Sequence, residues 1–257
     1  MPVVAPEAAS TGDLGSEPTA PGADSQTPEV APEPRDAEAA PATPMLELLP
    51  GIRVDRDRRL VEFDGLVPID VNDLDPLGYY KVVFLECVVT TPGAEKDHET
   101  LVVADIRPSN LHAALLMIGA EPGAPGDWAW DGQDVLRTAA RGDEIEVTLL
   151  WEAPDGARIE RDARELIVNE RTGEQFGGSA WVFAGSVEAP EIPAPYAADA
   201  TGLLVGLATF GTEVVAWREV ISHASEVDAP VWIADREVMP AYGTEVTVRL
   251  QLSAREP

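Results

Sequence analysis

One short stretch of the chain gathers side chains that could bind a metal ion or act as a nucleophile or a base. They are Glu86, Cys87, His98, Glu99 and His112. Thiolates, imidazoles and carboxylates are the usual protein ligands of zinc and iron, and a cysteine beside a base can also act as a nucleophile. These residue types therefore allow a metal centre or thiol chemistry, if the fold brings them together.

Two strands are predicted to position most of these side chains. Residues 81–90 form a nearly unbroken apolar run and residues 98–106 follow a Pro-Gly loop, so the two segments are expected to pair as a hairpin. A hairpin centred on Ala94 would pair Cys87 with Leu101. A shift of one residue in this register would exchange the faces on which the side chains lie.

The two faces of this hairpin decide which candidates can meet. Neighbours on a strand point to opposite faces, so Glu86 and Cys87 diverge, as do His98 and Glu99. In the first register Glu86 shares a face with His98, and Cys87 shares the other with Glu99. In the shifted register Cys87 moves to the face of His98. Either register joins two or three of the candidates, and neither joins all of them.

A helix is predicted to position the remaining candidate. Ser109 is a suitable N-cap, residues 111–118 are apolar nearly all round, and Gly119 is a suitable stop. This helix, residues 109–118, should lie buried against the sheet. His112 falls in its first turn, where the positive end of the helix dipole disfavours imidazolium, so a neutral ring is expected.

Two interpretations of these residues remain open. If the start of the helix lies over the hairpin, Glu86, His98 and His112 could form a two-histidine, one-carboxylate site for a divalent metal such as zinc or iron. The alternative is a polar network that ties the helix to the sheet without a metal. Cys87 is likewise either a nucleophile or an inert buried thiol. The sequence holds no Gly-x-Ser-x-Gly motif and no phosphate-binding glycine loop, which argues against hydrolases and nucleotide enzymes of those types.

Several of these residues lie in segments that together resemble the YdjY-like domain family. The segments are residues 84–87 (Phe-Leu-Glu-Cys), 96–103 (Lys-Asp-His-Glu-Thr-Leu-Val-Val), 107–116 (Arg-Pro-Ser-Asn-Leu-His-Ala-Ala-Leu-Leu), 119–123 (Gly-Ala-Glu-Pro-Gly) and 181–186 (Trp-Val-Phe-Ala-Gly-Ser). The resemblance covers roughly residues 50–252. It implies a bacterial protein, of a kind common in planctomycetes and often exported, and it implies no established activity.

The composition divides the chain into a tail and a domain. Residues 1–45 hold eight acids, one base, nine prolines and no aromatic residue, which predicts a disordered, self-repelling tether. Residues 46–257 are predicted to form a single domain. Short apolar runs between turns make it mainly β (α+β), with antiparallel sheets in a sandwich or a barrel and one buried helix.

The strands of this domain are expected from their apolar runs and turns. An Asp64-Gly65 turn predicts a hairpin of residues 59–63 and 66–71, and an Asp155-Gly156 turn joins two further strands. The later strands are expected at residues 144–151, 158–168, 181–184, 203–210, 214–218, 231–234 and 246–252.

The charge of the chain limits its partners and its location. The formal net charge is -28 at pH 7, which repels phosphate backbones and anionic lipid headgroups. Neither nucleic acid nor a membrane surface is therefore expected as a partner, which leaves a protein or a small ligand. No apolar run is long enough to span a bilayer, and no signal peptide begins the sequence. An exported or periplasmic location is expected if a signal is missing from this sequence, and a cytoplasmic one otherwise.

The single cysteine excludes an internal disulfide framework. These observations favour a β-rich binding or structural domain on a disordered tether in the bacterial envelope. The alternative is a metal-dependent or thiol-based enzyme with its site around Glu86, Cys87, His98 and His112.

Overall fold

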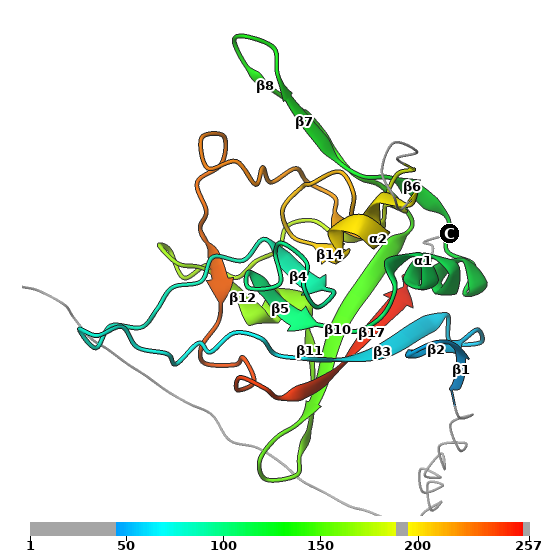
Figure 1. The fold of residues 1–257 in the computed structure, drawn as a ribbon, viewed down its shortest axis with the longest axis horizontal. Helices are drawn as coiled ribbons and strands as arrows, with labels where there is room; N and C mark the ends of the chain where they lie inside the picture. Colours follow the sequence, from blue (N-terminus) through cyan, green and yellow to red (C-terminus); the bar gives the residue numbers. More distant parts are fainter. Residues whose placement is uncertain (1–44, 189–194, 254–257) are drawn as a thin grey trace, which may run out of the picture. The chain divides into compact units, whose positions relative to one another are not determined.

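Figure 1 shows the fold in the computed structural model, which describes residues 45–188 and 195–253. The disorder predicted for residues 1–45 falls, apart from Met45, outside these residues. The described chain is mainly β, as the sequence predicted, and its central element is a barrel. No helix in the described ranges has the length and apolar content needed to cross a membrane.

Eight strands of the described chain form a closed ring. In order around the barrel they are β3 (Leu60–Leu66), β17 (Glu245–Leu252), β10 (Glu144–Glu152), β13 (Trp181–Phe183), β15 (Val215–Trp217), β14 (Leu203–Gly206), β4 (Cys87–Thr90) and β5 (Thr100–Val103). Leu66 pairs with Val103, which closes β5 onto β3. The pairs β14–β15 and β4–β5 are parallel and the others antiparallel, so the barrel is mixed.

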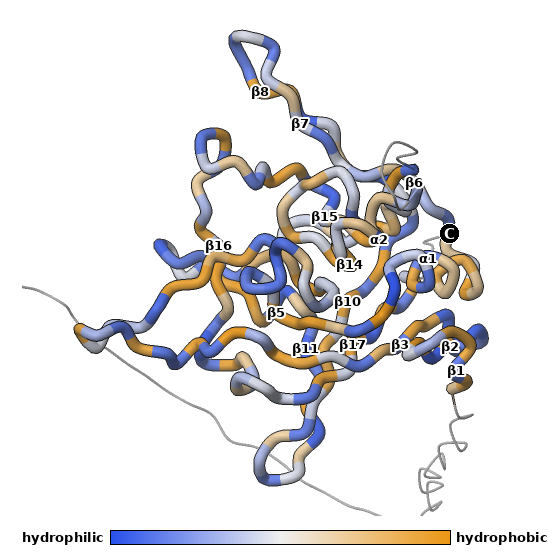
Figure 2. The backbone as a smooth tube through the Cα atoms, in the orientation of Figure 1, coloured by the Kyte–Doolittle hydropathy of each residue, from blue (hydrophilic) through white to orange (hydrophobic). Residues whose placement is uncertain are grey.

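Strands β3, β17 and β10 form the longest ladder of the barrel and lie side by side in Figure 1. β17 is the middle strand and its side chains alternate between the two faces. Even-numbered residues from Val246 to Leu252 are buried in the core, whereas odd-numbered residues from Glu245 to Gln251 lie on the outer face. This alternation supplies both the core and an outer surface of polar side chains. Figure 2 shows apolar positions along the barrel strands and hydrophilic tips on the projecting hairpins.

Other strands extend the ring or form small sheets beside it. β1 (Leu46–Leu49) and β2 (Ile52–Asp55) continue the sheet from β3, and β11 (Arg158–Asp162) pairs with β10. The two-stranded sheets are β12 (Ile167–Asn169) with β16 (Trp232–Ala234), β6 (Pro122–Ala124) with β9 (Arg141–Gly142), and β7 (Asp127–Trp130) with β8 (Val135–Thr138). The predicted strand of residues 158–168 is divided into β11 and β12 by a 3-10 turn, Ala163–Leu166, because the Asp162 carboxylate accepts the backbone N–H of Arg164.

The predicted helix is present as α1 (Pro108–Met117), and Gly119 ends it with a φ of 80°. Its predicted N-cap is wrong, because Arg107 is the N-cap residue and supplies no side-chain cap. The carboxylate of Asp199, in the short helix α2 (Ala197–Thr201), instead accepts hydrogen bonds from the backbone N–H and the hydroxyl of Ser109. α1 contacts both β3 and β14, so it bridges two strands that are not neighbours in the barrel.

The hairpin predicted for residues 81–90 and 98–106 is wrong in its direction. β4 and β5 are neighbours, but they run parallel, and Cys87 lies opposite Thr100 rather than Leu101. The faces predicted from an antiparallel register therefore do not apply.

The loop of residues 91–99 makes the parallel connection between β4 and β5. It is shorter than the usual crossover of about a dozen residues. The loop packs against Gly202 at the start of β14, where the Thr91 N–H donates to the Gly202 carbonyl. A Cβ at Gly202 would lie 2.8 Å from the Cβ of Ala94. This contact holds the loop against the start of β14, and the chain then returns to begin β5 beside the start of β4.

The Asp64-Gly65 pair does not form the predicted turn, because β3 continues through both residues to Leu66. A Cβ at Gly65 would lie 2.5 Å from Val102 Cγ1 and 2.7 Å from the Val103 carbonyl oxygen. Glycine at this position therefore allows β5 to approach β3 and close the barrel.

Candidate functional site

Lys96 joins two of the predicted site residues, Glu86 and Glu99. Its Nζ lies 2.5 Å from Glu86 Oε2 and 2.9 Å from Glu99 Oε2. The backbone N–H groups of Glu86 and Cys87 both donate to the Glu99 carbonyl, which fixes the two carboxylates beside each other. A lysine ammonium therefore takes the position between these carboxylates that a bridging metal ion would need.

The pKa values in this group follow from burial and from the neighbouring charges. Burial raises the pKa of Glu86, Lys96 opposes that rise, and the Glu99 carboxylate adds to it. Burial alone would lower the pKa of Lys96, but its hydrogen bonds to the two carboxylates outweigh burial and raise it. Lys96 thus remains a cation that neutralises part of the carboxylate charge.

His98 lies at the edge of this group, with 68% of its side chain exposed. Its Nε2 is 3.7 Å from Glu99 Oε1 and its Nδ1 is 3.8 Å from Asp97 Oδ1, both beyond hydrogen-bond range. The structure therefore brings His98 near Glu99 but leaves its ring largely in solvent.

His112 lies in a different environment, beside the segment that follows β13. Its Nδ1 is 2.9 Å from the Tyr196 hydroxyl, which donates to the Gly185 carbonyl. The ring also packs edge-on against Phe183, with the centroids 4.9 Å apart. Burial lowers the pKa of His112, and a hydrogen bond to the backbone of Gly185 opposes this only in part. His112 is therefore a neutral ring that ties α1 to the segments around Gly185 and Tyr196.

The described residues do not assemble the predicted metal set of Glu86, His98 and His112. No group of three or more histidine, cysteine, aspartate or glutamate side chains within residues 45–188 and 195–253 is placed to hold a metal ion. Metal binding by these residues stays a prediction. Of the two interpretations, the contacts of His112 fit the polar network.

Cys87 and Glu213 are buried together between β4 and the segment before β15. Cys87 is fully buried, and burial followed by the nearby Glu213 carboxylate raises the pKa of its thiol well above the usual value. Glu213 is also fully buried and accepts the Phe210 N–H, while its Oε2 has no hydrogen-bond partner in the described chain. Burial raises the pKa of Glu213, and the backbone N–H groups around it oppose this. Cys87 is thus a protonated core thiol.

A small pocket of about 160 Å³, lined by both polar and apolar side chains, adjoins the Glu86 and Glu99 carboxylates. It is lined by residues 84–86, 99, 208, 221–223, 225 and 228–232. His223 on its wall was missed in the sequence, where an isolated loop histidine gives no signal. Its Nδ1 must carry a proton, because it lies 3.0 Å from the Thr209 carbonyl, which can only accept.

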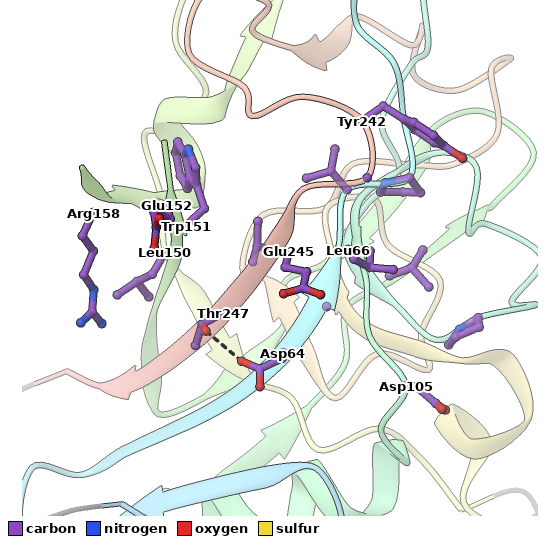
Figure 3. Close-up of a pocket in the computed structure, with 17 residues that line it drawn as sticks. Asp64, Leu66, Asp105, Leu150, Trp151, Glu152, Arg158, Tyr242, Glu245 and Thr247 are labelled. Atoms are coloured by element: carbon purple, nitrogen blue, oxygen red, sulfur yellow. Dashed lines mark hydrogen bonds between the residues drawn. The ribbon is translucent and has the colours of Figure 1, made fainter. Parts of the chain in front are cut away.

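A much larger concavity, here called the outer groove, has a volume of about 1010 Å³ and is shown in Figure 3. It is lined by residues 64–68, 92, 103, 105, 150–152, 158, 242–243 and 245–247. The strand register explains how these residues converge from distant parts of the chain. Leu150 pairs with Thr247 and Thr247 with Asp64, while Glu245 pairs with Leu66 in the next row. The groove therefore crosses the barrel strands.

Carboxylates dominate the charge of the outer groove. Asp64 is bound by Arg53 at 2.6 Å and by the Thr247 hydroxyl at 2.8 Å, and Arg53 holds the pKa of Asp64 below its usual value. Three more acids that line the groove are exposed and have no hydrogen bond or ion pair from their side chains within the described part of the chain: Asp105, Glu152 and Glu245. These three are available to an incoming cation.

Apolar side chains lie among these acids. Leu66 is 49% exposed and Tyr242 is 65% exposed, and both appear at the groove in Figure 3. Val103 and Leu150 also line it. The groove therefore presents an apolar surface with carboxylates around it, and Arg158 is the one basic side chain among its lining residues.

The comparison with known families agrees with the residues that suggested the resemblance. A family model described as the YdjY domain matches residues 52–251. The chain belongs to the YdjY domain family. No curated protein and no solved structure matches the chain.

The matched span of the YdjY domain contains the whole barrel, apart from Leu252, together with both concavities. The outer groove was missed in the sequence because its four acids lie on three different strands and in the loop after β5 of the YdjY domain. The period-2 pattern of β17 marks Glu245 and Thr247 as outward-facing, but it does not show which strands lie beside them.

Proposed function

We propose that this YdjY domain is a binding domain whose ligand occupies the outer groove and carries positive charge on an apolar framework. The observation that carries this proposal is the groove itself, about 1010 Å³ in volume, with Asp105, Glu152 and Glu245 exposed around apolar side chains. Ligand sites are typically the largest apolar concavity with a few polar groups at defined positions. The net charge of -28 adds long-range attraction for cations.

The state of the candidate cluster of Glu86, Cys87, Glu99 and His112 supports binding over catalysis. Cys87 is a fully buried thiol whose pKa is raised by burial, whereas a nucleophilic cysteine needs an accessible thiolate. Glu86 and Glu99 are held by Lys96, and His112 is engaged with Tyr196. These contacts give the four side chains structural roles, which supports a binding domain over an enzyme that uses them.

Small amphiphilic cations test the proposal. Tyramine and hexylamine should shift the NMR signals of groove residues such as Leu66 and Val103. Glu152→Gln combined with Glu245→Gln should weaken this binding several-fold, because each lost carboxylate removes a partly screened attraction. Hexanol and hexanoate should bind more weakly than hexylamine.

Two exposed acids outside the groove, Glu219 and Glu226, provide the matched control. Changing both to Gln removes the same formal charge and should leave amine binding nearly unchanged. Equal losses in the two double variants would show that only the net charge matters and would contradict a defined site. Shifts confined to residues outside the groove would contradict the proposal as well.

We also propose that the domain works in the bacterial envelope. The family resemblance and the proline-rich, acidic composition of residues 1–45 support this location, because such sequences serve as extended tethers. Fractionation of cells that express the gene at its natural level is the test. Recovery of the protein with cytoplasmic markers would overturn the location without bearing on the groove.

A further inference from the structure

We propose that the outer groove binds an extended polypeptide segment of about six residues, with basic side chains toward the Asp105 and Glu245 side and an acidic group toward Arg158. This inference rests on the proposed function and specifies the class of the ligand. It is carried by the length of the groove, by the order of its charges and by the apolar side chains between them.

The length of the groove comes from the strands that it crosses. Its lining residues lie on or directly after β11, β10, β17, β3 and β5, which are successive neighbours in the sheet. Strands lie about 4.8 Å apart, so five of them span roughly 19 Å. An extended chain rises about 3.3 Å per residue, and roughly six residues cover that distance.

The charges are unevenly distributed along this line. Arg158 lies on β11 at one end, and Asp105 follows β5 at the other, as Figure 3 shows. Glu245 lies between them on the central strand, next to Leu66. Glu152 lies opposite Arg158 on β10, so the Arg158 end carries both signs of charge and the Asp105 and Glu245 side carries acids alone. Arg158 has no side-chain hydrogen bond or ion pair within the described ranges, so its guanidinium can donate to a carboxylate of a ligand. A bound segment is therefore oriented by its charges.

The mixture of apolar and acidic side chains distinguishes a polypeptide from other cations. Leu66, Val103 and Tyr242 lie beside Glu245 and Asp105. A polyamine has no side chains for these apolar surfaces, and a nucleic acid is repelled by the charge of the chain. A polypeptide can present lysine or arginine and an aliphatic side chain on successive positions.

Recognition by side chains follows from the pairing of the floor strands. β17 pairs with β3 and β10, and β10 pairs with β17 and β11, so these strands have partners on both sides. These central strands therefore offer no free edge to which a peptide could add as a further strand, and β11, at the Arg158 end, is the one floor strand of the described chain that pairs on a single side. The identity and order of the ligand's side chains must supply the specificity.

Two blocked hexapeptides test this inference with the full chain. One carries two lysines at one end, two leucines in the middle and a glutamate at the other end, and the second has the same composition with the glutamate between the two lysines. Fluorescence anisotropy with dye-labelled peptides should show the first binding about tenfold more tightly, as expected when two partly screened contacts are lost in the second. The reversed sequence of the first peptide should bind about as tightly as the first, because side chains rather than the backbone are recognised.

Variants locate the contacts that cause this preference. Glu245→Gln should weaken the binding of the preferred peptide several-fold. Arg158→Gln should bring the ratio of the affinities for the two charge orders toward one. Glu219→Gln, outside the groove, should change neither. Equal affinities for all charge orders would overturn the inference.

The outcomes also separate this inference from the proposed function. Binding of hexylamine in the groove without binding of any hexapeptide would overturn the polypeptide and leave a small cationic ligand. Spermidine binding as tightly as the preferred peptide would overturn it in the same way. If neither the amines nor the peptides bind in the outer groove, both proposals are wrong.

Discussion

Asp199 caps helix α1 through Ser109, its Oδ1 accepting the Ser109 N–H at 2.8 Å and its Oδ2 accepting the Ser109 hydroxyl at 2.9 Å. The same carboxylate accepts a hydrogen bond from Arg107 Nε at 2.7 Å. Only 6% of its side chain is exposed. A single residue of α2 therefore accepts the hydrogen bond of a first-turn N–H group in a helix that lies about ninety positions earlier in the sequence.

Asp199→Ala should destabilise the domain by about 1–2 kcal/mol, because the first-turn N–H loses its acceptor and Arg107 loses its counter-charge. Asp199→Asn should cost less, since an amide oxygen can still accept from Ser109. Urea unfolding followed by tryptophan fluorescence measures the difference. The exposed Asp57 gives a control, and a loss from Asp57→Ala as large as that from Asp199→Ala would contradict the capping role.

Glu213→Gln should stabilise the domain above pH 7. Burial raises the folded-state pKa of Glu213 above its ordinary value of 4.5. The stability that its proton provides is fully present below the unfolded-state pKa and is lost as the pH rises through the folded-state pKa. Glutamine does not ionise, so the variant does not lose this stability as the pH rises. The gap in unfolding free energy between variant and wild type should widen with pH by at most about 1.4 kcal/mol per unit in that window. Parallel curves from pH 4 to 9 would contradict it.

Lys96→Met should destabilise the domain by about 1–2 kcal/mol, because the partly buried Glu86 and Glu99 carboxylates would face each other without a cation. The pKa of Glu86, already raised by burial, should rise further, so this loss should be larger at pH 8 than at pH 4. Lys81→Met is the matched control, because Lys81 pairs with Asp73 on the exposed surface and should have little effect. Equal effects of the two changes would contradict the role of Lys96.

The two candidate histidines should behave differently. His112→Ala should cost about 1–3 kcal/mol, because the partly buried Tyr196 hydroxyl loses one of its two hydrogen bonds and Phe183 loses the ring packed against it. His98→Ala should change stability by less than about 0.5 kcal/mol, since its ring is mostly in solvent. Thermal unfolding compares the two variants. Elemental analysis of the wild type adds a second test: a metal-to-protein ratio near one that disappears in His98→Ala would restore the metal site of Glu86, His98 and His112.

The local parts of this fold could be predicted from the sequence, and the long-range parts could not. α1 and the alternation of β17 follow from residues that are neighbours in the chain. The cap from Asp199 and the parallel pairing of β4 with β5 depend on segments that meet only in the folded barrel. Gly65 shows why one residue type can mislead, because glycine is common both in turns and at close backbone contacts.

The candidate site shows the same division. Residue types identified Glu86 and Glu99, which do lie together, but lysine is not a usual metal ligand, so its residue type does not mark Lys96 as their partner. His112 was expected to be neutral because of the helix dipole, whereas burial is the cause that the structure shows. Residue chemistry could be predicted, and the identity of each neighbour could not.

The position of β17 has a consequence for how the chain folds during synthesis. β17 is made last among the barrel strands, yet it lies between β3 and β10. Until it emerges from the ribosome, the two strands that it separates each have an unpaired side, and the ring cannot close. The nascent chain therefore depends on protection from aggregation until its final strand is complete, and a stop codon shortly before Glu245 should leave a product that aggregates instead of a smaller folded barrel.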